Sequence, residues 1–142
     1  MEEKIQLELS RYCVPFTPFR KRLEESAICL VTSAAIYHQA DEPFNPEGDE
    51  SFRVIPGGAP TSELRYCDTH YDHACIDQDL NCVFPIDRLH ELGHEKRVGG
   101  PSERHFSIGF TQALRKLRDT TVPALAKEVE QARPDAVLLT GG

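Results

Sequence analysis

Two continuous apolar runs, at Ala27–Thr32 and Ala136–Thr140, stand at opposite ends of the sequence. Runs of this length without polar alternation are typical of strands buried on both faces, as in a parallel sheet covered by helices. Shorter strands are predicted at residues 52–55, 64–67 and 106–108, and the first of them ends at Pro56 and the glycine pair that follows. The pattern therefore predicts at least two central strands that are far apart in the sequence.

Helices are predicted between these strands, at residues 19–25, 86–92, 111–118 and 122–132. In the second of them Ile86, Leu89 and Leu92 share one face, and Gly93 is a natural stop. Pro123 predicts a break or a fresh start between the last two. Because helices alternate with buried strands, we expect residues 1–142 to form a single three-layer α/β domain. Its sheet is expected to be mainly parallel and Rossmann-like, with helices on both faces.

The long segment from residue 33 to residue 58 is rich in Pro, Gly, Asn and Asp and carries three aromatic residues. Long loops inside compact domains are commonly functional, and the aromatics favour an ordered loop. In open parallel sheets, ligands bind where strands end at their carboxyl ends. We therefore expect the loops after Thr32 and after Thr140 to border a binding site, with His38 close to it. Simple exposure or hydrogen bonding of His38 is the alternative.

The densest polar stretch, residues 67–77, holds two His, three Asp and two Cys in eleven residues. Imidazole and thiolate are zinc and iron ligands, so His70, His73 and Cys82 are candidate metal ligands, although the spacing matches no standard zinc pattern. His70 and His73 also suit acid–base catalysis. The third interpretation is a polar loop in which side chains such as Asp72 cap helices and bond the backbone.

Composition narrows the classes of function. The chain has 142 residues, which suits one domain, and its net charge of −7 excludes nucleic acid as the main partner. No apolar stretch approaches the length of a membrane span and the N-terminus has no secretory pattern, so we expect no membrane association and a cytoplasmic protein. The five cysteines are expected to be free thiols. Phosphate-binding and hydrolase motifs are missing from the sequence.

Several segments, in order along the chain, resemble one family. They lie at residues 15–20, 30–33, 48–56, 70–72, 79–89 and 135–140, and the most specific is Asn-Cys-Val-Phe-Pro-Ile-Asp at 81–87. Together they resemble the N-terminal half of the selenoprotein B type subunit of glycine, sarcosine, betaine and D-proline reductases. The wording of residues 81–87 slightly favours the D-proline branch.

The resemblance implies an oxidoreductase subunit that cleaves a C–N or similar bond in a small amino-acid-like substrate. In that family a selenol or thiol follows the strand that residues 135–140 resemble, and partner subunits supply electrons. A selenolate is ionised at neutral pH and strongly nucleophilic. The candidate residues that orient substrate or transfer protons are His38, His70, Asp72 and His73, and the candidate substrate-loop residues are Ser33, Tyr37, Arg53 and Tyr71.

The sequence departs from the family at Gly141-Gly142, because the nucleophile and the second half are absent. One explanation is a reading frame cut at a UGA codon that encodes selenocysteine, and in that case the chain is part of an enzyme. The other is a short relative that acts as a catalytically silent accessory domain for a small molecule or a metal, or as a structural subunit. Selenocysteine and a metal are the cofactors left open, and other reductase subunits or a second copy are the expected partners.

Overall fold

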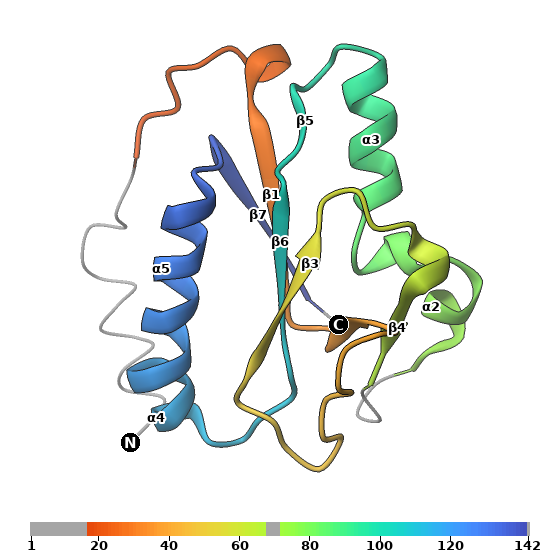
Figure 1. Cartoon of the computed structure of the whole chain (residues 1–142), viewed down its shortest axis with the longest axis vertical. Coiled ribbons are helices and arrows are strands. Elements are labelled where there is room, and N and C mark those ends of the chain that lie inside the picture. The colour runs from red at the N-terminus through yellow and green to blue at the C-terminus, as the bar shows by residue number, and fades with distance from the viewer. Residues whose placement is uncertain (1–16, 68–71, 142) are drawn as a thin grey trace.

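The strand β1 (Ala27–Thr32) lies at the centre of a five-stranded sheet in the computed structural model, which describes residues 17–67 and 72–141 (Figure 1). β7 (Ala136–Thr140) pairs with β1 in parallel along almost its whole length, from Ile28 opposite Ala136 to Thr32 opposite Thr140. β5 (Gly100–Pro101) and β6 (Arg104–Ile108) therefore share the other side of β1, also in parallel. β3 (Phe52–Pro56) runs antiparallel to β6.

The remaining elements surround this sheet. β2 (Ile36–His38) and β4 (Leu64–Tyr66) form a separate antiparallel pair. The α-helices are α2 (Ala74–Gln78), α3 (Ile86–His94), α4 (Leu114–Lys116) and α5 (Val122–Ala132), and a π-helical turn, η4 (Leu117–Thr121), joins the last two. Short 3₁₀ turns occur at η1 (Leu23–Glu25), η2 (Thr61–Glu63) and η3 (Leu80–Cys82). No helix within the described ranges is long and apolar enough to cross a membrane.

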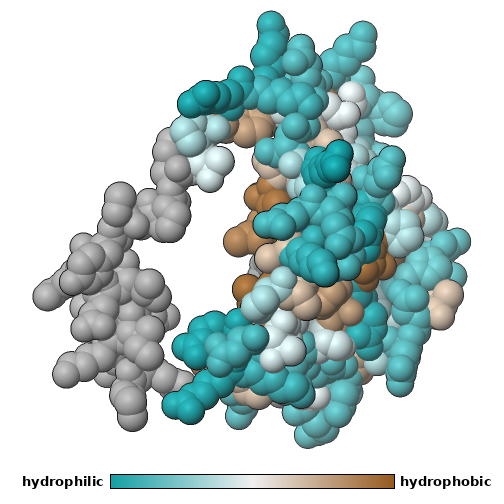
Figure 2. Space-filling model, turned by 60° about the vertical axis from the view of Figure 1, so that its left-hand side comes forward, coloured by the Kyte–Doolittle hydropathy of each residue, from teal (hydrophilic) through white to brown (hydrophobic). Residues whose placement is uncertain are grey.

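The strand β7 lies at the margin of the sheet. Within residues 17–67 and 72–141, β1 is the only strand that pairs with it. Its side chains at Val137, Leu138 and Leu139 are exposed although all three are apolar. Figure 2 shows brown hydrophobic side chains gathered on one side of a mostly hydrophilic surface.

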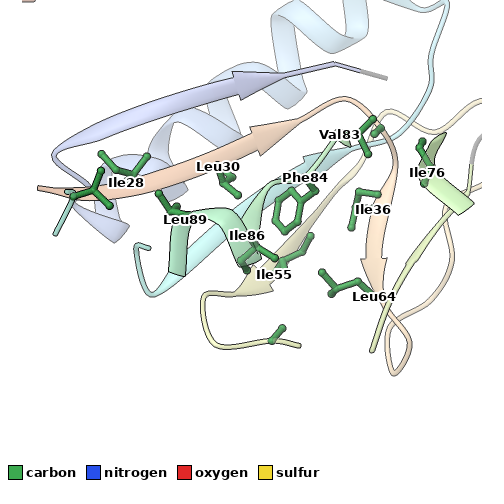
Figure 3. Packing of buried hydrophobic residues seen from close by; sticks show 13 residues of the cluster. Ile28, Leu30, Ile36, Ile55, Leu64, Ile76, Val83, Phe84, Ile86 and Leu89 are labelled. Carbon is green, nitrogen blue, oxygen red and sulfur yellow. The ribbon is translucent and has the colours of Figure 1, made fainter. Parts of the chain in front are cut away.

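The two faces of β1 belong to different hydrophobic clusters. Ile28 and Leu30 point into the larger cluster, which α3 covers and which extends to the β2–β4 pair (Figure 3). Cys29 and Val31 point to the opposite face, where α5 packs. The connection through α3 leads to one side of β1 and the connection through α5 to the other. Right-handed crossovers in opposite directions place their helices on opposite faces, which explains the arrangement.

These observations confirm an α/β fold built on the two apolar strands at 27–32 and 136–140. The sheet is mixed rather than wholly parallel, because β3 is antiparallel to β6. The predicted helix at 19–25 is wrong, since only the turn η1 forms there. The fresh start at Pro123 is confirmed, because α5 begins at Val122 with the proline in its first turn, where no N–H bond is lost, although a π-helical turn leads directly into it. The Rossmann-like three-layer order and the single domain over 1–142 stay predictions.

A buried histidine fills an irregular place between β1 and β6. The pairs Ile28–Pro101 and Val31–Phe106 leave more residues on the β5–β6 side than on β1, which is a bulge. There the backbone N–H of Leu30 donates to Nδ1 of His105 at 2.9 Å, so the hydrogen of the neutral ring is on Nε2. His105 is completely buried, and burial, with a smaller contribution from His90, lowers its pKa to about 4.

We expect His105 to make the fold sensitive to mild acid. In the unfolded chain the ring binds a proton near its ordinary pKa of 6.5, whereas in the folded protein it stays neutral down to about pH 4. Stability from this group is therefore complete above pH 6.5 and falls as the pH decreases from 6.5 towards 4, by roughly 3 kcal/mol in total. His105→Asn keeps an acceptor for Leu30 but cannot titrate. Urea unfolding at several pH values should show a shallower acid slope in the variant, and equal slopes would contradict this account.

The turn after β3 distinguishes two neighbouring glycines. A Cβ added at Gly57 would lie 2.0 Å from the backbone oxygen of Ser102, whereas one at Gly58 meets nothing within 4 Å. Gly57→Ala should therefore destabilise the protein by about 2 kcal/mol or more, because backbone has to shift. Gly58→Ala is the matched control, with an expected change within roughly 0.5 kcal/mol. Chemical denaturation measures both, and comparable losses in the two variants would refute the close packing.

Candidate functional site

The carboxyl ends of β1 and β7 lie side by side, which is the edge where the sequence predicts a site. Thr32 and Thr140 occupy the same level of the sheet, and the N–H of Ser33 donates to the carbonyl of Thr140 at 3.1 Å. A Cβ at Gly141 would lie 3.7 Å from Oγ of Ser33. Ser33 and Gly141 are both exposed, so the hydroxyl of Ser33 and the backbone leaving β7 face solvent together.

One carbonyl joins the two strand ends. The hydroxyl of Thr140 donates to the Val83 oxygen at 2.7 Å, and that of Thr32 donates to the same oxygen at 3.2 Å. Val83 is buried, so these bonds form away from water and satisfy a carbonyl that would otherwise be unpaired. The segment that carries Val83 therefore crosses the carboxyl edge of the sheet and fixes both strand ends.

An asparagine holds that segment in its turn. The side-chain amide of Asn81 donates to Asp79 at 2.8 Å and to Asp87 at 3.0 Å, and its oxygen accepts the backbone N–H of Asp87 at 3.0 Å. Thr61 adds a hydroxyl bond to the same Asp87 carboxylate at 3.0 Å. The bonds from Asn81, first the side chain and then the backbone N–H, lower the pKa of Asp79.

Cys82 lies between Asn81 and Val83 in the same turn. The thiol is exposed, and its pKa is raised, first by desolvation and then by the negative charges of Cys75 and Asp79. A thiol with a raised pKa is mostly protonated at neutral pH and is a poor nucleophile. Cys82 in this arrangement does not have the electrostatics of an activated nucleophile.

The predicted substrate-loop residues separate into two places. Ser33 lies at the strand ends, whereas Tyr37 and Arg53 both pack on Phe44. The Tyr37 ring meets Phe44 edge-on at 6.4 Å, and the guanidinium of Arg53 lies 4.3 Å from the Phe44 ring centre. Arg53 also donates to the carbonyl of Glu42 at 3.0 Å. These contacts attach the loop between β2 and β3 to the domain, and a role in substrate binding stays a prediction. Tyr71 lies outside the described residues.

His38 ends β2 and is held on both ring nitrogens. Nε2 lies 3.0 Å from a carboxylate oxygen of Glu63, and Nδ1 accepts the N–H of Ala40 at 3.2 Å. The hydrogen therefore sits on Nε2 when the ring is neutral, directed at Glu63. A histidine oriented by a carboxylate is a common acid–base arrangement, and the catalytic role of His38 remains a prediction.

The polar stretch of residues 67–77 is only partly described, because His70 lies outside the described residues. Asp72 accepts the N–H of Ala74 at 2.9 Å at the start of α2, which is the capping contact of the third interpretation. The His73 ring packs edge-on against Tyr66 with centres 4.8 Å apart. In the described part of the chain, no group of three or more His, Cys, Asp or Glu could hold a metal ion. The described residues therefore give no support to a metal site made of His70, His73 and Cys82.

Sequence reasoning missed the residues that organise this edge. The paired hydroxyls of Thr32 and Thr140 end the two apolar runs, and a polar residue at the same place in both runs was the available signal. The bridge from Asn81 to two acidic residues had no such signal, because it depends on side-chain directions inside a turn. The family segment 81–87 includes Asn81, but the resemblance did not reveal that the side chain of Asn81 bonds Asp79 and Asp87.

A comparison with curated proteins decides the family. Over 130 residues, which cover 89% of this chain, the sequence is 36% identical to the D-proline reductase subunit gamma of Acetoanaerobium sticklandii. This chain is a homologue of D-proline reductase subunit gamma. It spans about half of that subunit, 53% of its length. No family model matches the chain, and no solved structure matches it.

The match confirms the expected relation to the reductases and its D-proline branch. It does not distinguish the selenoprotein B type, which stays a prediction. Because the match to subunit gamma covers 89% of the chain, it includes most of the elements that build the carboxyl edge.

Removing the Asn81 bridge should weaken the turn that carries Val83. Asn81→Ala loses three side-chain bonds, including the acceptor for the backbone N–H of Asp87, so we expect a loss of about 1–3 kcal/mol in unfolding free energy. Asn45→Ala is the control, since the oxygen of that loop asparagine accepts one N–H, from Glu47. Thermal and urea unfolding compare the two. Equal effects would show that the 79–87 turn does not depend on Asn81.

Proposed function

We propose that this chain forms part of a gamma-type reductase subunit that cleaves a C–N bond in a small, proline-like amino acid. The observation that carries the proposal is the identity of 36% with D-proline reductase subunit gamma over 89% of the chain. The substrate class follows from the printed name of that relative. We further propose that the subunit acts in the cytoplasm, where its cysteines stay reduced.

The geometry of the carboxyl edge supports a site at the ends of β1 and β7. Ser33 offers an exposed hydroxyl beside the backbone at Gly141. A selenol or thiol placed directly after β7 would lie next to that hydroxyl. The raised pKa of Cys82 is consistent with a nucleophile that comes from elsewhere, so we propose that a selenocysteine or cysteine following Gly142 supplies it.

In the proposed reaction, a partner protein that carries two thiols supplies the two electrons that reduce the C–N bond. The selenolate or thiolate attacks the carbon that bears the ring nitrogen, a C–Se or C–S bond forms, and the C–N pair of electrons goes to nitrogen, which takes a proton. A thiolate of the partner then attacks the selenium or sulfur, the carbon takes a proton, and a mixed Se–S or S–S bond remains. A second thiol of the partner reduces that bond, so the dithiol becomes a disulfide. Within this chain, Ser33 would orient the substrate through its exposed hydroxyl.

The alternative is a catalytically silent accessory domain for a small molecule or a metal. The metal version has no support among the described residues, because they contain no group of three or more ligands. A small-molecule version would use the same strand ends without the nucleophile.

Substitution of Ser33 tests both the site and the reaction. We expect the reductase assembled in the native host, supplied with a dithiol, to consume D-proline, and Ser33→Ala to lower kcat/KM about tenfold through the loss of one substrate hydrogen bond. Ser62→Ala, an exposed serine in η2, should leave kcat/KM unchanged. Equal values for the two variants would remove Ser33 from the site.

Mass spectrometry of the same native-host preparation provides the second measurement. A peptide that continues past Gly142 with the isotope pattern of selenium, or with a cysteine, is expected. If the assembled preparation contains the folded chain and reduces no proline-like substrate, the reductase proposal is wrong and the accessory role is favoured.

A further inference from the structure

The margin strand β7 has the sequence of an internal strand. Val137, Leu138 and Leu139 are 41%, 46% and 74% exposed, whereas their neighbours Cys29 and Leu30 on β1 are fully buried. The exposed side chains lie on both faces, because Leu138 follows Leu30 towards the α3 face while Val137 and Leu139 follow Cys29 and Val31 towards the α5 face. Both faces of β7 are therefore apolar and only partly covered.

Natural edge strands avoid this state. They usually carry charged residues, prolines or bulges that prevent further pairing, and strands of parallel sheets are normally covered on both faces. β7 has no charged residue, proline or bulge between Ala136 and Thr140. Its outer edge offers a row of backbone N–H and C=O groups with no strand partner among the described residues.

The homology indicates what covers this edge. Close to half of D-proline reductase subunit gamma lies outside the match with this chain. A polypeptide of that size can supply both a strand for the backbone edge and helices for the two apolar faces. We propose that the free edge of β7 pairs with a β-strand from the unmatched half of a gamma-type subunit, which extends the sheet beyond β7.

This inference rests on the proposed function and adds a consequence for the site. With strands added beyond β7, the ends of β1 and β7 lie in the interior of the sheet edge. A chain that continues from β7 towards the added strands would diverge from the loop that leaves β1, and diverging loops leave a crevice at such a sheet edge. Ser33 and Gly141 then form the floor of that crevice, and the added half supplies its second wall.

A binding experiment with separate halves tests the proposal. The probe is the unmatched half of the Acetoanaerobium sticklandii gamma subunit, which is mixed with this chain after circular dichroism and a cooperative melt have shown that it is folded. Hydrogen exchange and native mass spectrometry should show a one-to-one complex with new protection of residues 136–140. A double variant, Leu138→Lys with Leu139→Lys, should weaken binding at least about a hundredfold, since it would bury unpaired charge.

Leu114→Lys is the matched control, because Leu114 is an equally exposed leucine, at 55%, on α4. It should bind like the unchanged chain, and all three proteins should melt alike when alone. No complex, or a complex without protection of β7, overturns the inference. A dimer of this chain that forms alone and disappears in the double variant also overturns it, in favour of a second copy at the same edge.

The outcomes separate this inference from the proposed function. If the halves pair through β7 but the assembled protein reduces no proline-like substrate, the interface stands and the proposed reaction is wrong. If the native assembly is active while β7 remains unprotected, the reaction stands and this interface is wrong.

Discussion

The fold depends on the burial of a single strand, β1, in which Ile28, Cys29, Leu30 and Thr32 are buried. Its backbone pairs on both sides, with β7 on one and with β5 and β6 on the other, and its side chains alternate between two hydrophobic clusters. At the buried positions of this strand, an unpaired backbone group could not be satisfied by water. The irregular place opposite Leu30 is therefore filled by the ring of His105, and the end of the strand is closed by the carbonyl of Val83.

The position of the candidate site also follows from the pairing of β1. Because β1 and β7 are parallel and in register, both deliver the residue after their last threonine to one edge. The turn at 79–87 then crosses this edge and ties it to α3, whose first turn contains Asp87. The segment most characteristic of the family thus contributes mainly by shaping the strand ends, while the exposed groups there come from Ser33 and Gly141.

The sequence predicted the parts of the structure that depend on local composition. The strands at 27–32 and 136–140 were found because burial on both faces leaves a continuous apolar run. The helix that begins at Ile86 was found because burial on one face leaves a periodic pattern. The antiparallel direction of β3 and the short pair β2–β4 could not be found, because pairing direction depends on distant segments. At the site, Ser33 lies next to the strand ends because it follows Thr32 directly, and its role there stays a prediction. The bond of His38 to Glu63 and the packing of Arg53 on Phe44 depend on rotamers that no pattern encodes.

The pairing of β1 with β7 joins residues far apart in the chain, as the bond from the N–H of Ala27 to Asp135 across 108 positions illustrates. Contacts between distant residues form slowly during folding, because closing a long loop precedes any gain from the contact. The groups at Ser33 and Gly141 consequently come together late in folding, because their meeting depends on closing the long loop between β1 and β7.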